Sequence, residues 1–269
     1  MFNFHSHTYM CRHAQNTPKE MVLEAIKRGF SSIGISEHYG KFPDGRWYGH
    51  SLFDAEQYFS ECKEAKEKYG DKIDVKIGVE MDFRPDNCKE IYEEIMAYEP
   101  DYIMGSLHFH NDFYFSGGFG DYKGKSPLEL DEIIRDYLET VIIMVNTGYV
   151  NNLNHFDLYK KFYELPDESV YYPYYKKIAE GLRDHNMSME FNTHYCEGEC
   201  LYKNDPEFYM LNLAKEYDIP VIVSADAHSK ELLSDKFEYA FKLLKEIGIK
   251  TTCRFDKCKV IKEPFIVRD

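Results

Sequence analysis

Apolar residues fall into two alternating patterns along the whole chain. Short runs rich in β-branched and aromatic residues predict buried strands. The segments between these runs carry apolar residues at every third or fourth position, which predicts helices with one face turned toward a core. Strands are expected at seven places: Phe2–His5, Ser32–Ser36, Val75–Val79, Tyr102–Leu107, Asn151–Asn154, Met187–Phe191 and Val221–Ala225.

Capping residues mark the boundaries of the helices. Thr17-Pro18 supplies an N-cap followed by proline at the first helical position, and the next helix begins after Asp54 and ends at Gly70. Further helices are expected over Cys88–Tyr98, Pro127–Val145, Tyr172–Asp184, Glu207–Tyr217 and Glu231–Ile247. A last extended stretch has no assigned place in this pattern; it covers Lys250–Phe255 and Lys259–Ile261.

Strand and helix therefore alternate in seven β/α units, without a linker or a low-complexity segment. This order is typical of an α/β fold with a parallel sheet, and 269 residues suit one α/β barrel. The count is one unit short of a complete eight-fold barrel. We expect a single TIM-like barrel domain that spans residues 1–269.

Composition and charge argue against several classes of protein. The net charge of −14 disfavours a nucleic-acid partner, because phosphate backbones are bound by clustered Lys and Arg. Seven cysteines without a Cys-x-x-Cys pair do not form a disulfide framework, which favours a reducing compartment. No apolar stretch reaches the roughly 18 residues of a membrane span, and no signal peptide precedes the first strand. We therefore expect a cytoplasmic protein without a membrane or nucleic-acid partner, and the oligomeric state stays open.

Seven of the eleven histidines stand at or just beyond the ends of predicted strands. His5 and His7 share one face of an extended segment, and Asp226 and His228 repeat this spacing. Glu80 closes the apolar run before it. The carboxyl ends of barrel strands meet at one mouth, and imidazole and carboxylate groups bind zinc, iron and manganese. The sequence therefore predicts a multinuclear metal site at the mouth of the barrel.

Several single assignments stay open at this stage. Glu80 would either bridge two cations about 3.5–4 Å apart or only cap its strand. Asp157 would either bind a metal or orient an imidazole. His13 lies in a loop, where histidines are commonly surface residues. Glu37 points to the opposite face of its strand from the neighbouring histidine, and we expect it to support an imidazole or the fold.

Seven short motifs carry a resemblance to a known family. They are His5-Ser6-His7-Thr8, Cys11-Arg12-His13-Ala14, Ser36-Glu37-His38, Gly78-Val79-Glu80, Gly105-Ser106-Leu107-His108-Phe109, Glu190-Phe191-Asn192-Thr193 and Ser224-Ala225-Asp226-Ala227-His228. Together they resemble the PHP superfamily (polymerase and histidinol phosphatase), specifically its monofunctional histidinol-phosphatase branch. The resemblance runs from residue 5 to residue 228, nearly the whole chain.

The resemblance implies a distorted (β/α)7 barrel that holds three divalent metal ions. Zinc is the first candidate, and iron and manganese are the alternatives. The resemblance assigns to the first ion the ligands His5, His7, Glu80 and Asp226. It assigns to the second ion Glu80, His108 and His155, and to the third ion His13, His38 and His228.

One departure from that branch concerns phosphate binding. In the branch, the motif after the fifth strand tends to read His-x-Asp-x-x-Arg, and an Arg usually follows the Glu-x-Asn-Thr motif. Here Lys160 takes the first of these Arg positions, and residues 194–200 contain no Arg. Lys is a point charge, whereas Arg binds phosphate through two parallel hydrogen bonds. The candidate substrate contacts are Lys160, Arg12, His194 and Asn192.

The implied activity is hydrolysis of a small phosphate monoester, first of all histidinol phosphate, by a hydroxide shared between two cations. Glu80 is the candidate bridge, and Asp226 is a candidate for proton transfer or a ligand only. Three alternatives remain: a phosphoesterase for another phosphorylated metabolite, an amidohydrolase-type C–N hydrolase, and a non-catalytic PHP scaffold. The Ser36-Glu37-His38 motif and His13 favour the phosphatase over the C–N hydrolase. None of the nine ligand positions is degraded, which disfavours the scaffold.

Overall fold

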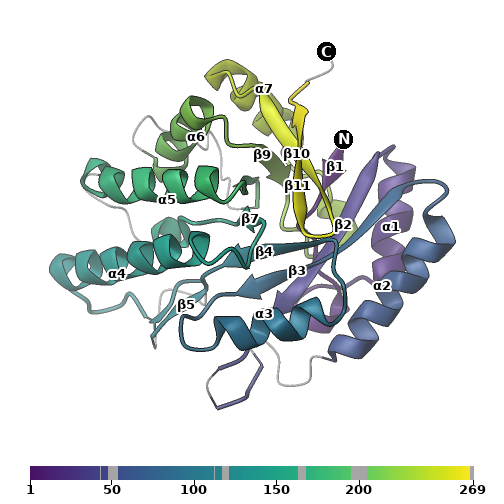
Figure 1. The fold of residues 1–269 in the computed structure, drawn as a ribbon, viewed down its shortest axis with the longest axis horizontal. Coiled ribbons are helices and arrows are strands. Elements are labelled where there is room, and N and C mark those ends of the chain that lie inside the picture. The colour runs from purple at the N-terminus through teal and green to yellow at the C-terminus, as the bar shows by residue number, and fades with distance from the viewer. Residues whose placement is uncertain are drawn as a thin grey trace.

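The computed structural model describes residues 1–42, 44–47, 54–111, 113–116, 121–162, 168–194 and 205–266. Within these ranges, seven parallel strands form one sheet in chain order, at the centre of the molecule in Figure 1. They are β1 (Phe2–Asn3), β2 (Ser32–Tyr39), β3 (Asp74–Asp82), β4 (Tyr102–Ser106), β7 (Asn152–Leu153), β8 (Ser188–Asn192) and β9 (Val221–Ser224). The seven predicted strands are confirmed, although β1 and β7 are shorter than expected.

The sheet bends until its two edge strands meet. β1 and β9 are the edges, and just beyond them Ser6 forms a parallel bridge with Ala227. The amide of His7 donates to the carbonyl of Ala227 at 2.9 Å, and the amide of Ala227 donates to the carbonyl of His5 at 3.1 Å. The predicted barrel of seven β/α units is therefore confirmed, and the histidine motif of the first strand helps to close it.

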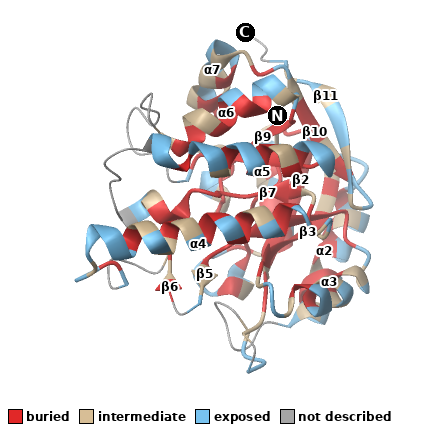
Figure 2. Cartoon of the chain, turned by 60° about the vertical axis from the view of Figure 1, so that its left-hand side comes forward, coloured by how far each residue is buried: buried red, intermediate tan, exposed pale blue. Residues whose placement is uncertain are grey.

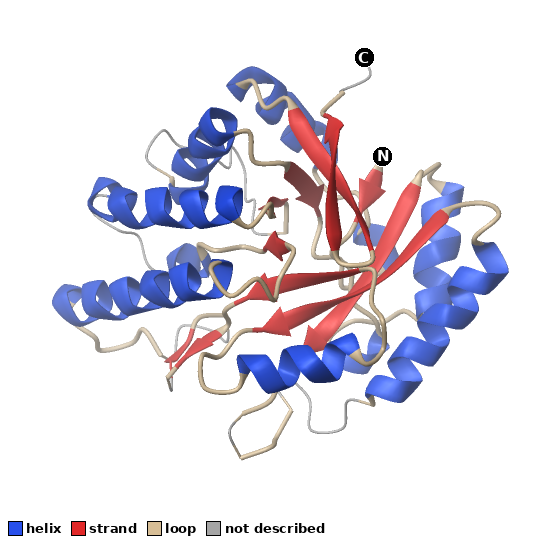
Figure 3. Cartoon of the chain, viewed as in Figure 1, coloured by secondary structure: helices blue, strands red, loops and turns tan. Residues whose placement is uncertain are grey.

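Seven α-helices of the described chain pack around the sheet, as the blue ribbons of Figure 3 show. They are α1 (Pro18–Lys27), α2 (Ala55–Tyr69), α3 (Cys88–Met96), α4 (Pro127–Val145), α5 (Tyr172–Asp184), α6 (Pro206–Tyr217) and α7 (Phe237–Ile247). Buried residues lie on the faces that meet the sheet and exposed residues lie on the outer faces (Figure 2). Thr17 and Ser126 each form a capping box in front of a proline, which fixes where α1 and α4 begin.

Short elements complete the described chain. They are the hairpin of β5 (Phe109–His110) and β6 (Phe113–Tyr114), and the 3-10 turns η1 (Tyr9–Cys11), η2 (Leu158–Phe162), η3 (Glu168–Tyr171) and η4 (Lys230–Leu232). None of the helices in these ranges has the length and apolar character needed to cross a bilayer. The cysteines that the structure describes are free thiols: Cys11, Cys62, Cys88, Cys253 and Cys258.

One helix boundary differs from the sequence prediction by more than two residues. A helix is expected from Glu231, but α7 starts at Phe237. The preceding residues contact the barrel instead, and the Nδ2 group of Asn3 donates to the carbonyl of Leu233 at 3.1 Å. The carbonyl of Leu233 is therefore bonded to a residue of β1. Between Glu231 and the start of α7, the chain forms only the end of the turn η4.

The last extended stretch, which the sequence pattern leaves unassigned, forms an antiparallel hairpin of β10 (Thr251–Asp256) and β11 (Lys259–Pro264). Figure 1 places this hairpin beside the N-terminus. The hairpin turn is held at the amino ends of two strands. The amide of Cys258 donates to the carbonyl of Asp101 at 2.8 Å, and Asn151 donates from Nδ2 to the carbonyl of Cys258 at 2.8 Å. The hairpin therefore covers the end of the barrel opposite to the predicted metal site.

Aromatic side chains fill this covered end. Phe255 of the hairpin packs against Phe4, with ring centroids 5.2 Å apart, and stacks on Tyr102 at 4.9 Å. Two glycines make room for the tyrosine. A Cβ atom on Gly34 would lie 2.2 Å from the Tyr102 hydroxyl, and one on Gly78 would lie 2.4 Å from its ring. Only glycine allows this close approach of strand and ring.

The aromatic cluster predicts that the hairpin belongs to the stability of the barrel. We expect Phe255→Ala to lower the free energy of unfolding by about 3–5 kcal/mol, because it opens a cavity among buried rings. Urea denaturation of the parent and the variant measures this loss. The matched control is Ile266→Ala, because Ile266 is 74% exposed, and its change should stay within about 0.5 kcal/mol. If Phe255→Ala lowers the free energy of unfolding as little as the control does, the hairpin does not contribute to the stability of the core.

Candidate metal centre

The carboxyl ends of the parallel strands bring the nine predicted ligands to one mouth of the barrel. Six of them are buried: His5, His7, Glu80, His108, His155 and Asp226. His38 and His228 are half-buried, and His13 is exposed at the rim. Polar side chains at such depth need partners, since burying an uncompensated charge or lone pair is costly.

Four donor atoms face one another at the centre of the mouth. The Nε2 atom of His5 lies 3.1 Å from Nε2 of His7, and 3.4 Å from both Oε2 of Glu80 and Oδ1 of Asp226. His7 Nε2 lies 3.4 Å from the same oxygen of Glu80 and 3.0 Å from that of Asp226. Four ligands placed tetrahedrally at zinc-like bond lengths are about 3.3–3.4 Å apart. These five distances are thus close to the spacing expected at a tetrahedral metal site.

The two oxygens of Glu80 face different groups of histidines. Oε2 faces the group just described and also lies 2.8 Å from Nδ1 of His38. Oε1 lies 2.9 Å from Nε2 of His155 and 3.6 Å from Nε2 of His108, and it accepts a hydrogen bond from Ser106 at 2.5 Å. A carboxylate oriented in this way has the geometry to bridge two cations.

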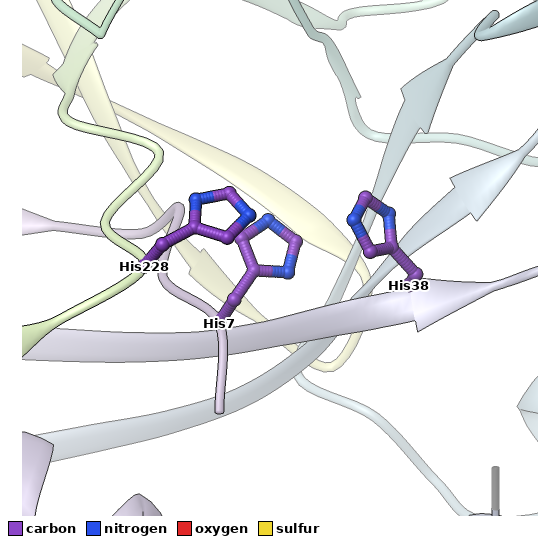
Figure 4. Close-up of side chains that lie close together, drawn as sticks. All are labelled: His7, His38 and His228. Atoms are coloured by element: carbon purple, nitrogen blue, oxygen red, sulfur yellow. The ribbon is translucent and has the colours of Figure 1, made fainter. Parts of the chain in front are cut away.

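The remaining histidines gather around His7. Figure 4 shows the rings of His228 and His38 on either side of the His7 ring, with centroids 4.4 Å and 4.3 Å away. The ring of His13 lies 4.6 Å from that of His228 and 5.4 Å from that of His38. The structure therefore brings together the three residues that the resemblance assigns to a third ion.

Buried carboxylates fix the orientation of three of the imidazoles. A carboxylate can only accept, so the ring nitrogen that faces it must carry the hydrogen, and the other nitrogen presents its lone pair to the mouth. The pairs are His5 Nδ1 with Glu190 Oε1 at 2.6 Å, His7 Nδ1 with Glu37 Oε1 at 3.1 Å, and His108 Nδ1 with Asp82 Oδ1 at 2.9 Å. In each case Nε2 is left as the donor atom that a metal requires.

Backbone carbonyls do the same for two rim histidines. His13 Nδ1 donates to the carbonyl of Cys11, and His228 Nδ1 donates to the carbonyl of Asp226, both at 2.9 Å. Asp226 has a left-handed backbone, with φ at 45°, which aspartate tolerates better than most residues. Its carbonyl can therefore orient His228 while its side chain faces His5 and His7.

Glu190 and Asp82 have roles that the sequence analysis does not identify. Glu190 accepts hydrogen bonds from His5, from the hydroxyl of Ser224, from the amide of His155 at 3.1 Å and from Asn192 Nδ2 at 3.1 Å. A glutamate inside an apolar strand is the signal that could have found it. Asp82 shares the strand face of Glu80, and this alternation is a similar signal.

The charges of the mouth favour a bound cation. Burial opposes protonation of His7, but the neighbouring carboxylates of Asp226 and Glu37 outweigh it and raise the pKa of His7 to about 10. Burial alone would raise the pKa of Glu80, yet the neighbouring imidazoles hold it well below its usual range. The pKa of Asp226 is lowered by imidazoles in the same way. Carboxylates that stay ionised at this depth call for positive charge between them.

The donor set fits divalent metal ions. Glu80 Oε2 and Asp226 Oδ1 are buried and accept no hydrogen bond from the described part of the chain. They face the Nε2 atoms of His5 and His7, whose lone pairs would repel each other at 3.1 Å without a cation or a proton between them. Imidazole and carboxylate ligands suit zinc, iron and manganese alike.

The four candidate substrate contacts lie around this mouth in different surroundings. Arg12 is exposed, with φ at 63°, at the end of η1. Asn192 is buried; it donates to Glu190 and accepts from the amide of His194 at 2.9 Å. His194 is exposed, and its ring lies 5.7 Å from that of His228. The ammonium group of Lys160 contacts the carboxylates of Asp157 and Asp205. Their roles in substrate binding stay predictions.

The model of the PHP domain family matches residues 3–194, more than half of the chain. The chain belongs to this family. The resemblance drawn from the seven motifs is thereby confirmed.

Several relatives of this PHP protein are similar over nearly their whole length. A probable histidinol-phosphatase of Deinococcus radiodurans is 26% identical over 92% of this chain and 94% of its own. The histidinol-phosphatase of Bacillus subtilis is 25% identical over 83% of this chain and 92% of its own. The crystal structure of histidinol phosphate phosphatase from Lactococcus lactis, complexed with zinc, L-histidinol and phosphate, superposes with a TM-score of 0.80 at 22% identity. It covers 96% of this chain and 98% of its own, and supports the fold.

The contacts of Glu190 predict a specific effect on metal binding. Glu190→Gln keeps the shape of the side chain but removes the charge that holds the hydrogen on His5 Nδ1. We expect the affinity for zinc to fall about 10–100-fold, as replacement of such supporting carboxylates commonly does. Competition with a chromophoric chelator measures this affinity. Glu216→Gln on the exposed side of α6 is the control. Parent-like zinc affinity in Glu190→Gln would show that Glu190 does not support metal binding.

Proposed function

We propose that this PHP protein is a metal-dependent phosphate monoesterase, with histidinol phosphate as its substrate. The observation that carries the proposal is the orientation of Glu80, whose two oxygens face two separate groups of imidazole donors. Binuclear centres with a bridging carboxylate are typical of phosphoesterases. Relatives with the name histidinol-phosphatase, and the Lactococcus lactis structure with L-histidinol and phosphate, support the choice of substrate.

The buried charges support three divalent ions at this mouth. Five carboxylates that contact the imidazoles are at most 5% exposed: Glu37, Glu80, Asp82, Glu190 and Asp226. Two divalent ions would leave part of this charge uncompensated in a buried place, which is costly. Three ions supply six positive charges, one more than the five carboxylates neutralise. This excess positive charge would attract an anionic substrate. The proposed ligands are His5, His7, Glu80 and Asp226 for one ion, Glu80, His108 and His155 for the second, and His13, His38 and His228 for the third.

Divalent cations bound here would lower the pKa of a nearby water and neutralise phosphoryl oxygens. The chain's own residues supply the geometry. Glu190, Glu37 and Asp82 keep the Nε2 lone pairs of their histidines pointed into the mouth. Asp226 lies beside His5 and His7 at the first proposed ion, and we propose its carboxylate as the acceptor of the proton that the attacking water loses; the alternative role is that of a ligand only.

A substrate panel tests the activity. We expect the zinc- or manganese-loaded protein to release phosphate from histidinol phosphate with a kcat/KM at least about 10-fold above that for an aryl phosphate, a difference of about 1.4 kcal/mol in transition-state stabilisation. Phosphate release is followed colorimetrically. Equal turnover of both monoesters would keep a phosphatase and reject this substrate. Amine release from amide substrates without phosphate release would favour the C–N hydrolase.

Metal analysis tests the bridging role of Glu80. We expect about three divalent ions per chain in protein purified without chelator, and the loss of more than one ion together with activity in Glu80→Ala, because two donor groups share this side chain. Elemental analysis gives the stoichiometry, and circular dichroism gives the fold. Less than one ion in the parent would contradict the trinuclear centre. Full metal content and normal turnover in Glu80→Ala would show that Glu80 does not bridge two ions and only terminates its strand.

A further inference from the structure

Two residues at the mouth of the barrel have left-handed backbones, and each stands close in the chain to a rim histidine. Arg12 has φ at 63° and directly precedes His13, and Asp226 has φ at 45° and stands two residues before His228. The conformation is sterically unfavourable for residues other than glycine, more so for arginine than for aspartate. Such backbones persist only where the surrounding structure holds them, and they gather at functional sites.

Both rim histidines are oriented by the same kind of backbone contact. The Nδ1 group of each ring donates to the carbonyl two residues earlier in the chain, His13 to Cys11 and His228 to Asp226, both at 2.9 Å. In an extended strand, residues two apart are separated by about 6–7 Å, and side chains stand perpendicular to the sheet, so this contact does not form. The left-handed residue in each segment supplies the bend that allows it.

Hydrogen bonds hold both bends in place. The amide of Arg12 donates to the carbonyl of Tyr9 at 3.0 Å and closes the turn η1. The amide of Gln15 donates to the carbonyl of His228 at 3.2 Å, which joins the loop of the first bend directly to the segment of the second. The two bends therefore belong to one ordered piece of the rim.

Asp226 serves two groups of donor atoms through separate atoms of its own. Its Oδ1 atom lies 3.0 Å from Nε2 of His7, in the group proposed for the first ion. The same oxygen lies 3.6 Å from Nδ1 of His228, beyond hydrogen-bond distance, so the carbonyl and not the carboxylate orients this ring. The neighbouring Ala227 is fixed at the seam of the barrel by its hydrogen bonds to His5 and His7.

The third proposed ion differs from the other two in its ligands. Its set consists of three imidazoles at or near the rim: His13, His38 and His228. Glu80 contributes a charged oxygen to each of the other two sets. A cation without a carboxylate ligand gains less Coulomb energy from its site. A small conformational cost in the protein therefore changes the occupancy of this ion more than that of the others.

We propose that Arg12 and Asp226 are positioning residues for the third ion, and that they act through their left-handed backbones, which aim the rings of His13 and His228 into the mouth. The carboxylate of Asp226 serves the first ion separately. The inference rests on the proposed metal centre and identifies what holds its least charged site. It gives Arg12 a role of its main chain, which is independent of any contact between its guanidinium group and a substrate.

Matched glycine and alanine variants test the role of Arg12. Both remove the guanidinium group, but glycine adopts the left-handed conformation freely and alanine does not. We expect Arg12→Gly to bind the third ion about 5-fold more tightly than Arg12→Ala, the scale of the cost of a left-handed residue, and Arg12→Val to bind it more weakly than either. Zinc titration against a chromophoric chelator measures the affinities, and the step that disappears in His228→Ala identifies the third ion.

The same pair at Asp226 separates its backbone from its carboxylate. Asp226→Gly and Asp226→Ala should both lose the first ion. We expect Asp226→Gly to keep the third ion with an affinity within about threefold of the parent value, and Asp226→Ala to bind it about 5-fold more weakly than Asp226→Gly. If an alanine variant does not fold, Arg12→Gly and Asp226→Asn should still keep the third ion, since glycine and asparagine both tolerate the left-handed conformation.

The orientation of the rings gives a readout that a purely structural role would not change. In the zinc-loaded parent, the Nδ1–H groups of His13 and His228 should give slowly exchanging proton signals in nuclear magnetic resonance spectra. These signals should remain in the glycine variants and weaken in the alanine variants. Lys257 is the control, because its backbone is left-handed, with φ at 48°, in the hairpin at the opposite end of the barrel. Lys257→Gly and Lys257→Ala should bind zinc equally.

Three results would overturn the inference. Equal affinity for the third ion in the glycine and alanine variants of one position would remove the proposed role of that residue. Loss of the third ion in Asp226→Gly as complete as in His228→Ala would show that the carboxylate holds it. A parent without any binding step that depends on His228 would contradict the site itself. If this step is intact but no monoester releases phosphate, the proposed phosphatase activity is wrong and the positioning roles remain.

Discussion

Negative charge buried at the mouth of the barrel is the constraint on which the rest of the structure depends. Each carboxylate there would cost several kcal/mol without compensation, and each one contacts imidazoles that come from other strands. Glu80 alone faces His5, His38 and His155, which lie far apart in the sequence. Such contacts exist only when the sheet has closed. The closing bridge between Ser6 and Ala227 lies directly beside His5, His7 and Asp226, so closure of the barrel brings these donor groups together.

The opposite end of the same barrel has the opposite chemistry. Phe4, Tyr102 and Phe255 pack there as a buried aromatic cluster, under the hairpin of β10 and β11. The two ends share their strands: Phe4 directly precedes His5, and Tyr102 and Ser106 are the two ends of β4. Packing at one end therefore fixes the register at which donor atoms arrive at the other. Packing at one end can in this way place donor atoms from separate strands about 3 Å apart at the other.

Supporting carboxylates give the site its chemistry as much as the ligands do. Imidazole offers two nitrogens, and only the partner of one nitrogen decides which lone pair is free for a metal. Glu190 illustrates this dependence, because it holds the ring of His5 and the backbone of His155 at once. One side chain thereby coordinates the positions of two different donor groups.

The sequence by itself determined the strand and helix order, the barrel class and the gathering of histidines at strand ends, because these follow from local periodicity and from the parallel direction of β/α units. Tertiary structure alone decided the place of the final hairpin. The alternation of side chains along a strand predicts that a strand forms, but it does not identify the part of the fold against which that strand packs. It also decided the start of α7, where Leu233 bonds to Asn3. The surroundings of Lys160 were likewise beyond the sequence. Its partner Asp205 is distant in the chain and meets η2 only through the fold.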